Sequence, residues 1–274
     1  MPIDFNDERN KFTYTGRAAD ESWTKAILSL DDPNGLRVAD VGCGGGIYSR
    51  AWFALGAREV IGVDSSPNMI SAASENCSGL SGVSFQIGDA TNTGLSENLF
   101  DVVFERALIH HLADIHSCLQ EAMRILKPGG MIIIQDRTPE DISFPGSHEH
   151  IRGYFFECFP RLLKIDSGRR RTDEEVLSEL SAVGFEHAES ITVWETRKVY
   201  PFKGELLEDI RQRKGRSILH ELNDLEIESL ISFIDERIDN FSEIAEKDRW
   251  TIWHATKQRQ FLSDFLERLR ARLP

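Results

Sequence analysis

Cysteine is scarce in this chain of 274 residues and shows no paired spacing. The four cysteines, Cys43, Cys77, Cys118 and Cys158, are scattered, and no C-x-x-C pair occurs among them. Disulfide-rich folds and structural zinc sites depend on such clustered spacing. The sequence therefore excludes a disulfide scaffold and indicates no metal site. We expect most of these thiols to behave as small buried hydrophobes.

Long hydrophobic runs are also missing. No stretch approaches the roughly 20 apolar residues that are needed to cross a bilayer. The first residues of the chain are acidic and lack the apolar core of a signal peptide. We therefore expect no membrane span and a cytoplasmic protein.

Basic residues are outnumbered by acidic ones. Lys and Arg together number 32 against 45 Asp and Glu, which gives a formal net charge of −13. Such a surface repels polyphosphates on average. This balance disfavours a nucleic-acid partner and favours a small molecule as the substrate.

The first half of the chain alternates short apolar runs with stretches of helical spacing. Strands that alternate with helices predict βαβ units, a parallel sheet and helices on both of its faces. We therefore predict an α/β, doubly wound fold. The predicted strands are residues 37–41, 59–64, 83–87, 100–104 and 131–135, and the predicted helices are residues 18–30, 47–55, 67–76 and 115–126.

The second half of the chain carries more charge and fewer strand patterns. Residues 138–171 hold several prolines and glycines between aromatic residues, and we predict a loop there. Residues 189–199 and 249–256 read as two further strands. An apolar stripe over residues 227–241 predicts an amphipathic helix, whose exposed face would offer a surface for a homodimer.

A glycine-rich loop follows the first predicted strand. Gly42, Gly44 and Gly46 alternate after Asp40, between a strand and a helix. Ligands bind at this place in a doubly wound sheet, because glycine permits positive φ and a close approach of the backbone. A dinucleotide site needs G-x-G-x-x-G, and its third glycine is missing in either register. Asp40 disfavours a pyrophosphate but would favour an ammonium group, as in an amino-acid moiety.

Carboxylates also follow the next two predicted strands. Asp64 ends the second strand, where a carboxylate accepts both hydroxyls of a ribose, a device that NAD sites share. Asp89 follows the third strand and could accept from an adenine amino group. Plainer roles exist for both, because Asp64 precedes a helix start and Asp89 lies in a turn. Together the two residues indicate a nucleoside ligand.

These features occur in an order that resembles the class I S-adenosylmethionine (SAM)-dependent methyltransferases of the small-molecule type. The resemblance covers about residues 36–136. Besides the glycine loop and Asp64, it rests on Gly-Asp-Ala at 88–90, Phe-Asp-Val-Val-Phe at 100–104 and Leu-Lys-Pro-Gly-Gly at 126–130. It implies a Rossmann-like, mixed seven-stranded sheet with an antiparallel last edge. It also implies SAM as the cofactor and S-adenosylhomocysteine as the product.

The resemblance further implies a role for each matched residue. The loop that begins at Asp40 would hold the methionine part of the cofactor, and Asp64 would hold the ribose. Met69, which could also be plain core, and the Asp89 region would contact adenine, while the end of the fourth strand would face the sulfonium. The implied cofactor-binding residues are Tyr14, Arg17, Asp40, Gly42, Gly44, Gly46, Asp64, Ser65, Met69, Asp89, Ala90, Glu105 and Arg106.

The same resemblance divides the chain into segments. Residues 1–30 would form a helical segment over the cofactor, in which Tyr14 and Arg17 match a Tyr-x-x-Arg element that closes over the cofactor carboxylate. Residues 31–200 would form the SAM-binding core, with 138–171 as its substrate-side loop. Residues 201–245 would be an inserted helical cap, and 246–274 the last strand and a C-terminal helix.

No dedicated catalytic residue is legible, because the sulfonium donor is already activated and the protein mainly aligns the reactants. His110 and His111 follow the fourth strand and could take a proton from an acceptor; alternatively, one packs into a helix start and the other is solvated. We expect an enzyme that methylates a small molecule. The alternatives are a non-catalytic SAM-binding module and an NAD-type oxidoreductase.

Overall fold

The computed structural model of this chain describes residues 18–239 and 243–259. Tyr14 and Arg17, and the helix expected near the C-terminus, lie outside these residues. Within the described ranges, no helix has the length and apolar character needed to cross a membrane.

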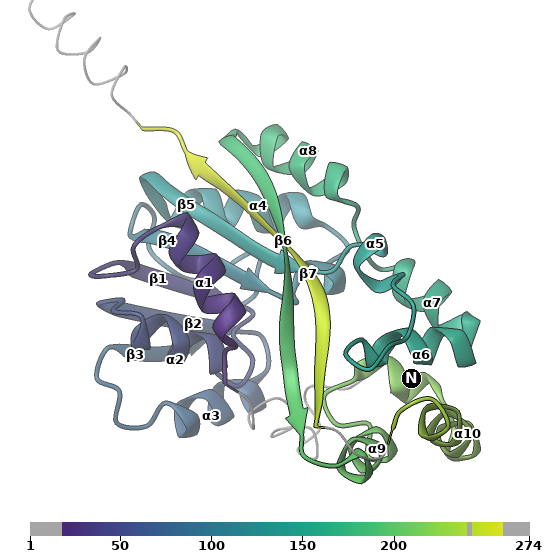
Figure 1. Cartoon of the computed structure of the whole chain (residues 1–274). Coiled ribbons are helices and arrows are strands. Elements are labelled where there is room, and N and C mark those ends of the chain that lie inside the picture. Colours follow the sequence, from purple (N-terminus) through teal and green to yellow (C-terminus); the bar gives the residue numbers. More distant parts are fainter. Residues whose placement is uncertain (1–17, 240–242, 260–274) are drawn as a thin grey trace, which may run out of the picture.

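A seven-stranded sheet in the order β3-β2-β1-β4-β5-β7-β6 forms the centre of the molecule (Figure 1). The first five strands are parallel, whereas β7 runs antiparallel to both β5 and β6. This confirms the predicted doubly wound sheet with an antiparallel last edge. The strands are β1 (Arg37–Val41), β2 (Glu59–Asp64), β3 (Val83–Ile87), β4 (Phe100–Arg106), β5 (Leu126–Asp136), β6 (Phe185–Tyr200) and β7 (Ile244–Lys257).

Helices cover both faces of the sheet because the central strands are apolar on both sides. On one face, Trp23 of α1 (Glu21–Leu30) and Trp52 of α2 (Ile47–Ala54) pack on the sheet and meet edge to face at 5.8 Å. On the other face lie α4 (Ile115–Ile125) and α8 (Asp173–Val183). The helix α3 (Pro67–Asn76) follows β2 and begins at a serine cap.

Residues 138–171 form three helices, which corrects the loop predicted there. They are α5 (Pro139–Ile142), α6 (Ile151–Cys158) and α7 (Pro160–Ser167). Proline opens α5 and α7 at the first helical position, where its missing N–H costs nothing. Pro139 and Pro160 are therefore helix starts, whereas Pro145 lies between α5 and α6.

A second hydrophobic core joins these helices to the segment inserted between β6 and β7. That segment contributes α9 (Lys203–Arg211), the short 3₁₀ helix η3 (Ser217–Glu221) and α10 (Asp224–Asp235). The apolar stripe of α10 is buried in this core: Ile227, Leu230 and Ile234 are each at most 1% exposed. The stripe is therefore not the exposed surface on which the expected homodimer rested.

The antiparallel pair β6–β7 extends well past the sheet. β5 pairs with β7 only over Thr251–Thr256, whereas β6 pairs with β7 as far as the Tyr200–Ile244 pair. Figure 1 shows the two strands running on beyond the sheet to α9 and α10. This two-stranded ribbon connects the second core to the carboxyl ends of the parallel strands.

Candidate functional site

The glycine loop between β1 and α2 has the left-handed backbone that its sequence predicts. Gly42, Gly44 and Gly46 have φ of +73°, +50° and +79°. A Cβ at Gly42 would lie 2.9 Å from Leu108 Cδ1, and one at Gly46 would lie 3.0 Å from a ring carbon of Phe85. At Gly44, by contrast, a Cβ would meet nothing within 4 Å. The loop is thus packed at both ends and open in its middle.

Asp64, at the end of β2, is bonded directly to this loop. Its carboxylate accepts from the backbone N–H of Gly44 at 2.9 Å and from that of Ser66 at 2.9 Å. The cap of α3 is Ser66, whose hydroxyl accepts from Met69 N–H, so Asp64 is not itself the helix cap. Partial burial raises the pKa of Asp64. The structure therefore places Asp64 beside the open part of the loop.

Asp40 lies beneath the loop and is 2% exposed. One of its carboxylate oxygens accepts from Ser49 Oγ of α2 at 2.5 Å. Burial raises the pKa of Asp40 to about 7, and the nearby negative charge of Asp64 adds to the effect. Two neighbouring carboxylates in a buried setting favour a positively charged ligand, because a cation would stabilise the ionised form of both.

The residues expected to contact adenine lie in three different settings. Met69 is 3% exposed and faces the interior from α3, as the plain-core alternative describes. Asp89 is exposed, and its carboxylate accepts from the N–H and the hydroxyl of Thr91, which is the geometry of a turn residue. Ala90 packs against the sheet core, whereas Ser65 is exposed.

Glu105 and Arg106 lie at the end of β4, and they differ in how completely their side chains are hydrogen-bonded. Glu105 is 1% exposed; one oxygen accepts from the Cys118 thiol at 3.4 Å, and Oε2 has no hydrogen-bond partner. Burial raises the pKa of Glu105 to about 7. An uncompensated buried carboxylate oxygen is costly and therefore rare.

The guanidinium of Arg106 is held within the protein. Its Nη2 donates to both carboxylate oxygens of Glu195 at 2.7 and 2.8 Å, and its Nε donates to Gln135 at 3.0 Å. It also lies 4.2 Å from the ring centres of both Tyr48 and Trp250. Arg106 thus connects β4 to the ribbon, a contact that the sequence did not predict.

His110 lies on the 3₁₀ turn η2 (Ile109–His111), directly after β4, and faces the end of β5. Its ring Nδ1 is 2.8 Å from Asp136 Oδ2, and the same carboxylate is bonded by Arg170 Nη1 at 2.7 Å. The His110 side chain is 8% exposed, whereas His111 is exposed. Both histidines were predicted from the sequence, whereas Asp136 and Arg170 were not. The position of Asp136 at the carboxyl end of a strand, like that of Asp64, was the available signal.

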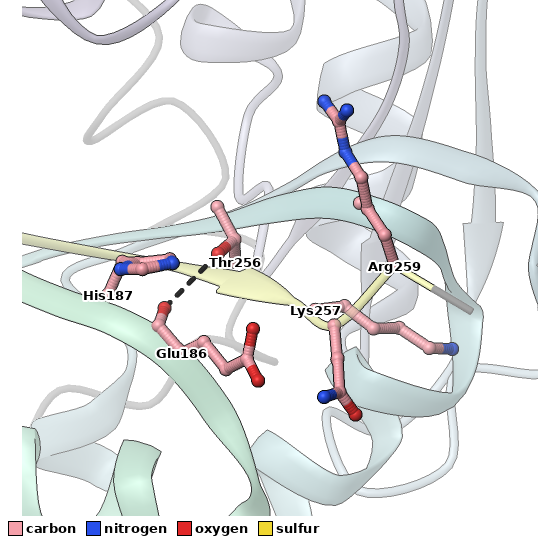
Figure 2. A pocket seen from close by; sticks show the side chains of 7 residues that line it. Glu186, His187, Thr256, Lys257 and Arg259 are labelled. Atoms are coloured by element: carbon pink, nitrogen blue, oxygen red, sulfur yellow. Dashed lines mark hydrogen bonds between the residues drawn. The ribbon is translucent and has the colours of Figure 1, made fainter. Parts of the chain in front are cut away.

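A surface hollow lies at the opposite edge of the sheet, lined by residues from the start of β6 and the end of β7 (Figure 2). Thr256 donates to the backbone oxygen of Glu186 across it at 3.2 Å. Since Thr256 pairs with Met131 near the start of β5, this hollow is remote from the glycine loop. In the described part of the chain, no group of three or more His, Cys, Asp or Glu could hold a metal ion.

Comparison with known proteins agrees with this geometry. Residues 39–134 match the family model described as a methyltransferase domain. The chain is 40% identical over 142 residues to phosphoethanolamine N-methyltransferase 1 of Arabidopsis thaliana, a match that covers 49% of this chain and 28% of that protein. It is 33% identical over 126 residues to the ubiquinone biosynthesis O-methyltransferase of Rhizobium johnstonii, covering 45% and 50%. The chain thus spans half or less of these relatives.

A solved structure resembles the fold over most of the chain. It is phosphoethanolamine N-methyltransferase 2 of Haemonchus contortus, in complex with phosphomonomethylethanolamine and S-adenosylhomocysteine. The TM-score is 0.60 at 22% identity, and the match covers 94% of this chain and 61% of that one. The family match falls on β1 to β5, which include the glycine loop and Asp64. The chain therefore carries a methyltransferase domain of the class I SAM-dependent family.

Proposed function

We propose that this protein is an enzyme that transfers a methyl group from SAM to a small-molecule acceptor. The observation that carries the proposal is the bonding of Asp64 to Gly44 N–H, next to the open part of a left-handed glycine loop. One oxygen of this carboxylate accepts from the loop, and the carboxylate lies where a doubly wound sheet binds its ligand.

The residues present fit this cofactor. The loop from Gly42 to Gly46 would receive the methionine part, and the buried charge of Asp40 favours its ammonium group. Asp64 would accept from the ribose hydroxyls, and the half-buried Ala90 offers apolar surface to adenine. When bound, SAM supplies a methyl group on a positively charged sulfur, which is already activated for displacement. The protein then needs to align the acceptor in line with that bond.

A small acceptor agrees with the charge and with the comparisons. The net charge of −13 disfavours polyanionic substrates such as nucleic acid. The relatives named above are, by their names, N- and O-methyltransferases of phosphoethanolamine and of ubiquinone biosynthesis. The helices of the second core, α5 to α7 with α9 and α10, stand beside the carboxyl ends of the strands and would enclose such an acceptor.

Calorimetric titration with SAM, and with NAD as the competing ligand, tests the cofactor. We expect micromolar binding of SAM, no binding of NAD, and loss of SAM binding in Asp64→Ala. The matched control is Asp32→Ala, which removes an exposed carboxylate from the turn before β1 and should leave the affinity unchanged. Binding of NAD in preference to SAM would refute the proposal.

Transfer of radiolabel separates an enzyme from a module that only binds SAM. The full chain is incubated with methyl-tritiated SAM and a pooled low-molecular-mass cell extract, and the extract is then separated by chromatography. We expect label in a small-molecule fraction that is absent with Asp64→Ala. SAM binding without transfer into any fraction would contradict catalysis while leaving the cofactor assignment intact.

A further inference from the structure

Arginine and aspartate side chains form a cluster, here called the arginine cluster, where the carboxyl end of β5 meets β7 and the second core. Three aspartates, one each from β5, α7 and β7, are bonded by four arginines. The aspartates are Asp136, Asp166 and Asp248, and the arginines are Arg137, Arg152, Arg169 and Arg170. Arg137 directly follows β5 and therefore lies at the edge where a doubly wound sheet binds its ligands.

The arginine cluster holds one positive charge more than its carboxylates balance. Burial raises the pKa of each aspartate, but the neighbouring positive charges outweigh it and hold all three pKa values well below the usual range. His110 and His150 lie beside the cluster, and burial lowers their pKa values, so both are uncharged at neutral pH. Arg169 is the most exposed of the four arginines at 27%, yet its Nε and Nη2 both donate to Asp166. Four guanidinium charges therefore face three carboxylates.

Two further carboxylates next to the arginine cluster are already neutralised. Glu195 accepts twice from Arg106 Nη2, at 2.7 and 2.8 Å. Glu246 accepts from Arg197 at 2.6 Å and from Arg216 at 2.7 Å, so two cations already bond it. A buried charge without a counter-charge is costly. The surplus positive charge therefore indicates an anionic ligand.

Arg137 is the least committed of the four guanidinium groups. Its Nη2 donates to Asp248 at 2.6 Å, whereas its buried Nε has no hydrogen-bond partner among the described residues. Arg152 instead donates through both Nε and Nη1, to Asp248 and Asp166, and Arg170 donates through three nitrogens. Burial lowers the pKa of Arg137 to about 9 in spite of Asp248, and the charges of Arg152 and Arg170 contribute. The surplus charge is therefore located at Arg137.

Trp250 fixes the orientation of this guanidinium. Its ring centre lies 3.7 Å from Cζ of Arg137 and 4.2 Å from Cζ of Arg106. An arginine that stacks by its face keeps its edge for hydrogen bonds, and the planar edge matches a carboxylate. The side chain of Arg137 is 10% exposed, so it is buried but not sealed from a ligand.

We propose that the methyl acceptor carries a carboxylate and that Arg137 binds it. This inference rests on the proposed function and names the chemical class of its substrate. One carboxylate supplies the single negative charge that the arginine cluster lacks. A phosphate monoester carries about −1.5 to −2 near pH 7 and would reverse the imbalance.

The bound carboxylate takes no part in bond making, because its electron pairs are engaged by the guanidinium. Another atom of the acceptor forms the bond to the methyl carbon while the carbon–sulfur bond breaks, and that bond's electron pair stays on sulfur. The product therefore keeps its negative charge. Arg137 is a substrate-binding residue, and Trp250 is the positioning residue that orients it.

Nitrogen-15 NMR of the arginine-labelled full chain tests the anion site without an activity assay. The Arg137 Nε–H signal is assigned by its loss in Arg137→Met. Sodium acetate is the probe, acetamide is its uncharged counterpart, and sodium chloride keeps the ionic strength constant. We expect acetate to shift the signal to saturation and acetamide to leave it in place. A signal that does not move throughout the acetate titration, or that moves equally with acetamide, would overturn the proposal.

Charge fractionation of the pooled extract tests the acceptor itself. The extract is divided on an anion exchanger, and each fraction is incubated with the full chain and tritiated SAM. We expect label in the retained fraction, with or without prior alkaline phosphatase treatment, and a labelled product that survives mild alkali. Label in the unretained fraction would contradict an anionic acceptor. Loss of label after phosphatase would indicate a phosphate instead, and release by alkali would mean that the carboxylate itself is methylated.

Substitution of Arg137 tests its role with the active fraction. Arg137→Met keeps an apolar stem on Trp250 but removes the charge. We expect the acceptor concentration at half-maximal rate to rise about 10–100-fold, because hydrogen bonds to a charged group are lost. The maximal rate and the SAM affinity should change much less. Arg137→Lys should restore part of the loss, because it keeps the charge without the planar edge.

Arg161→Met is the matched control. Arg161 also lies over a ring, that of Phe159 at 5.1 Å, and also bonds one carboxylate, that of Glu226, but its side chain is 46% exposed. This variant should keep the wild-type concentration dependence. The same result for Arg137→Met would overturn the assignment. If Arg137→Met unfolds at lower urea than wild type, Arg137→Lys and the acetate titration of the wild-type chain decide instead.

The possible failures are separable. Label in the unretained fraction overturns the carboxylate acceptor alone, and the enzyme remains a methyltransferase. Absence of SAM binding by wild type overturns the proposed function and the acceptor with it. The acetate titration stands apart from both, since it needs neither cofactor nor acceptor.

Discussion

Replacing Glu105 with Gln should make the protein's stability less sensitive to pH. In the folded protein Glu105 is buried, its Oε2 has no hydrogen-bond partner, and burial raises its pKa to about 7 from the usual 4.5. A carboxyl whose folded pKa lies above its unfolded pKa stabilises the fold fully below pH 4.5. That contribution is lost as the pH rises through about 7.

The size of the effect follows from these two pKa values. Each pH unit between 4.5 and about 7 removes about 1.4 kcal/mol of wild-type stability, which totals about 3 kcal/mol. Glutamine has the same shape and does not ionise, so any fixed cost of its amide is the same at every pH. The unfolding free energy of Glu105→Gln minus that of wild type should therefore increase by most of this amount between pH 5 and pH 8.5.

Urea unfolding of the cofactor-free protein, followed by circular dichroism at several pH values, measures the gap between variant and wild type, which is the difference between their unfolding free energies. Glu121→Gln is the matched control, because Glu121 is also a buried glutamate. Its ion pair with Arg124 and its bonds to Thr93 hold its pKa below the usual value in spite of burial. The gap between Glu121→Gln and wild type should thus stay constant above pH 5. A Glu105→Gln gap that is equally constant, within about 0.5 kcal/mol, would refute the reasoning.

Two further predictions concern the residues around the loop and the ribbon. SAM affinity, measured by calorimetry, should be highest above pH 7 and fall as the pH drops through about 7, because the cationic cofactor favours the ionised form of Asp40; in Asp40→Asn this dependence should vanish. Arg106→Met should destabilise the protein by about 3–5 kcal/mol in urea unfolding, because it leaves the buried charge of Glu195 unpaired. Arg211→Met, at an exposed ion pair, should cost much less than Arg106→Met, and equal costs for the two variants would contradict a buried role for Arg106.

Local patterns predicted the parallel half of the fold well. The bounds expected for the strands at 37–41, 59–64 and 83–87 agree with β1, β2 and β3. Each of these strands is a short apolar run that ends at a turn, so its composition and the flanking turn residues are enough to predict its bounds. The left-handed glycines of the loop were predictable for the same reason, since their conformation is a local property.

The helices α5 to α7 were missed because proline and glycine were read only as breakers. Thr138 caps α5 and shares a capping box with Asp141, with Pro139 at the first helical position. Thr172 shares the same kind of capping box with Glu175 before α8, with no proline after the cap. A helix start that contains proline needs the cap to be considered before the proline.

Contacts between distant residues could not be derived from the sequence. Arg106 and Glu195 are 89 positions apart, and their pairing depends on the path of the ribbon past the end of β4. His110 was proposed from its place after a strand, but its bond to Asp136 requires the register of β4 on β5 and the turn at Ala107. Tertiary arrangement, rather than local propensity, decides such pairs.

The position of β7 between β5 and β6 has a consequence for synthesis of the chain. During translation, every strand from β2 to β5 can join a neighbour that has already been made, whereas β6 cannot. Among the described strands its one partner is β7, which is translated more than forty residues later. Until then the outer edge of β5 is unpaired and β6 has no place in the sheet. The C-terminal strand therefore completes the sheet and anchors the inserted helices in one event, and a chain that ends before Ile244 would retain an open edge prone to association.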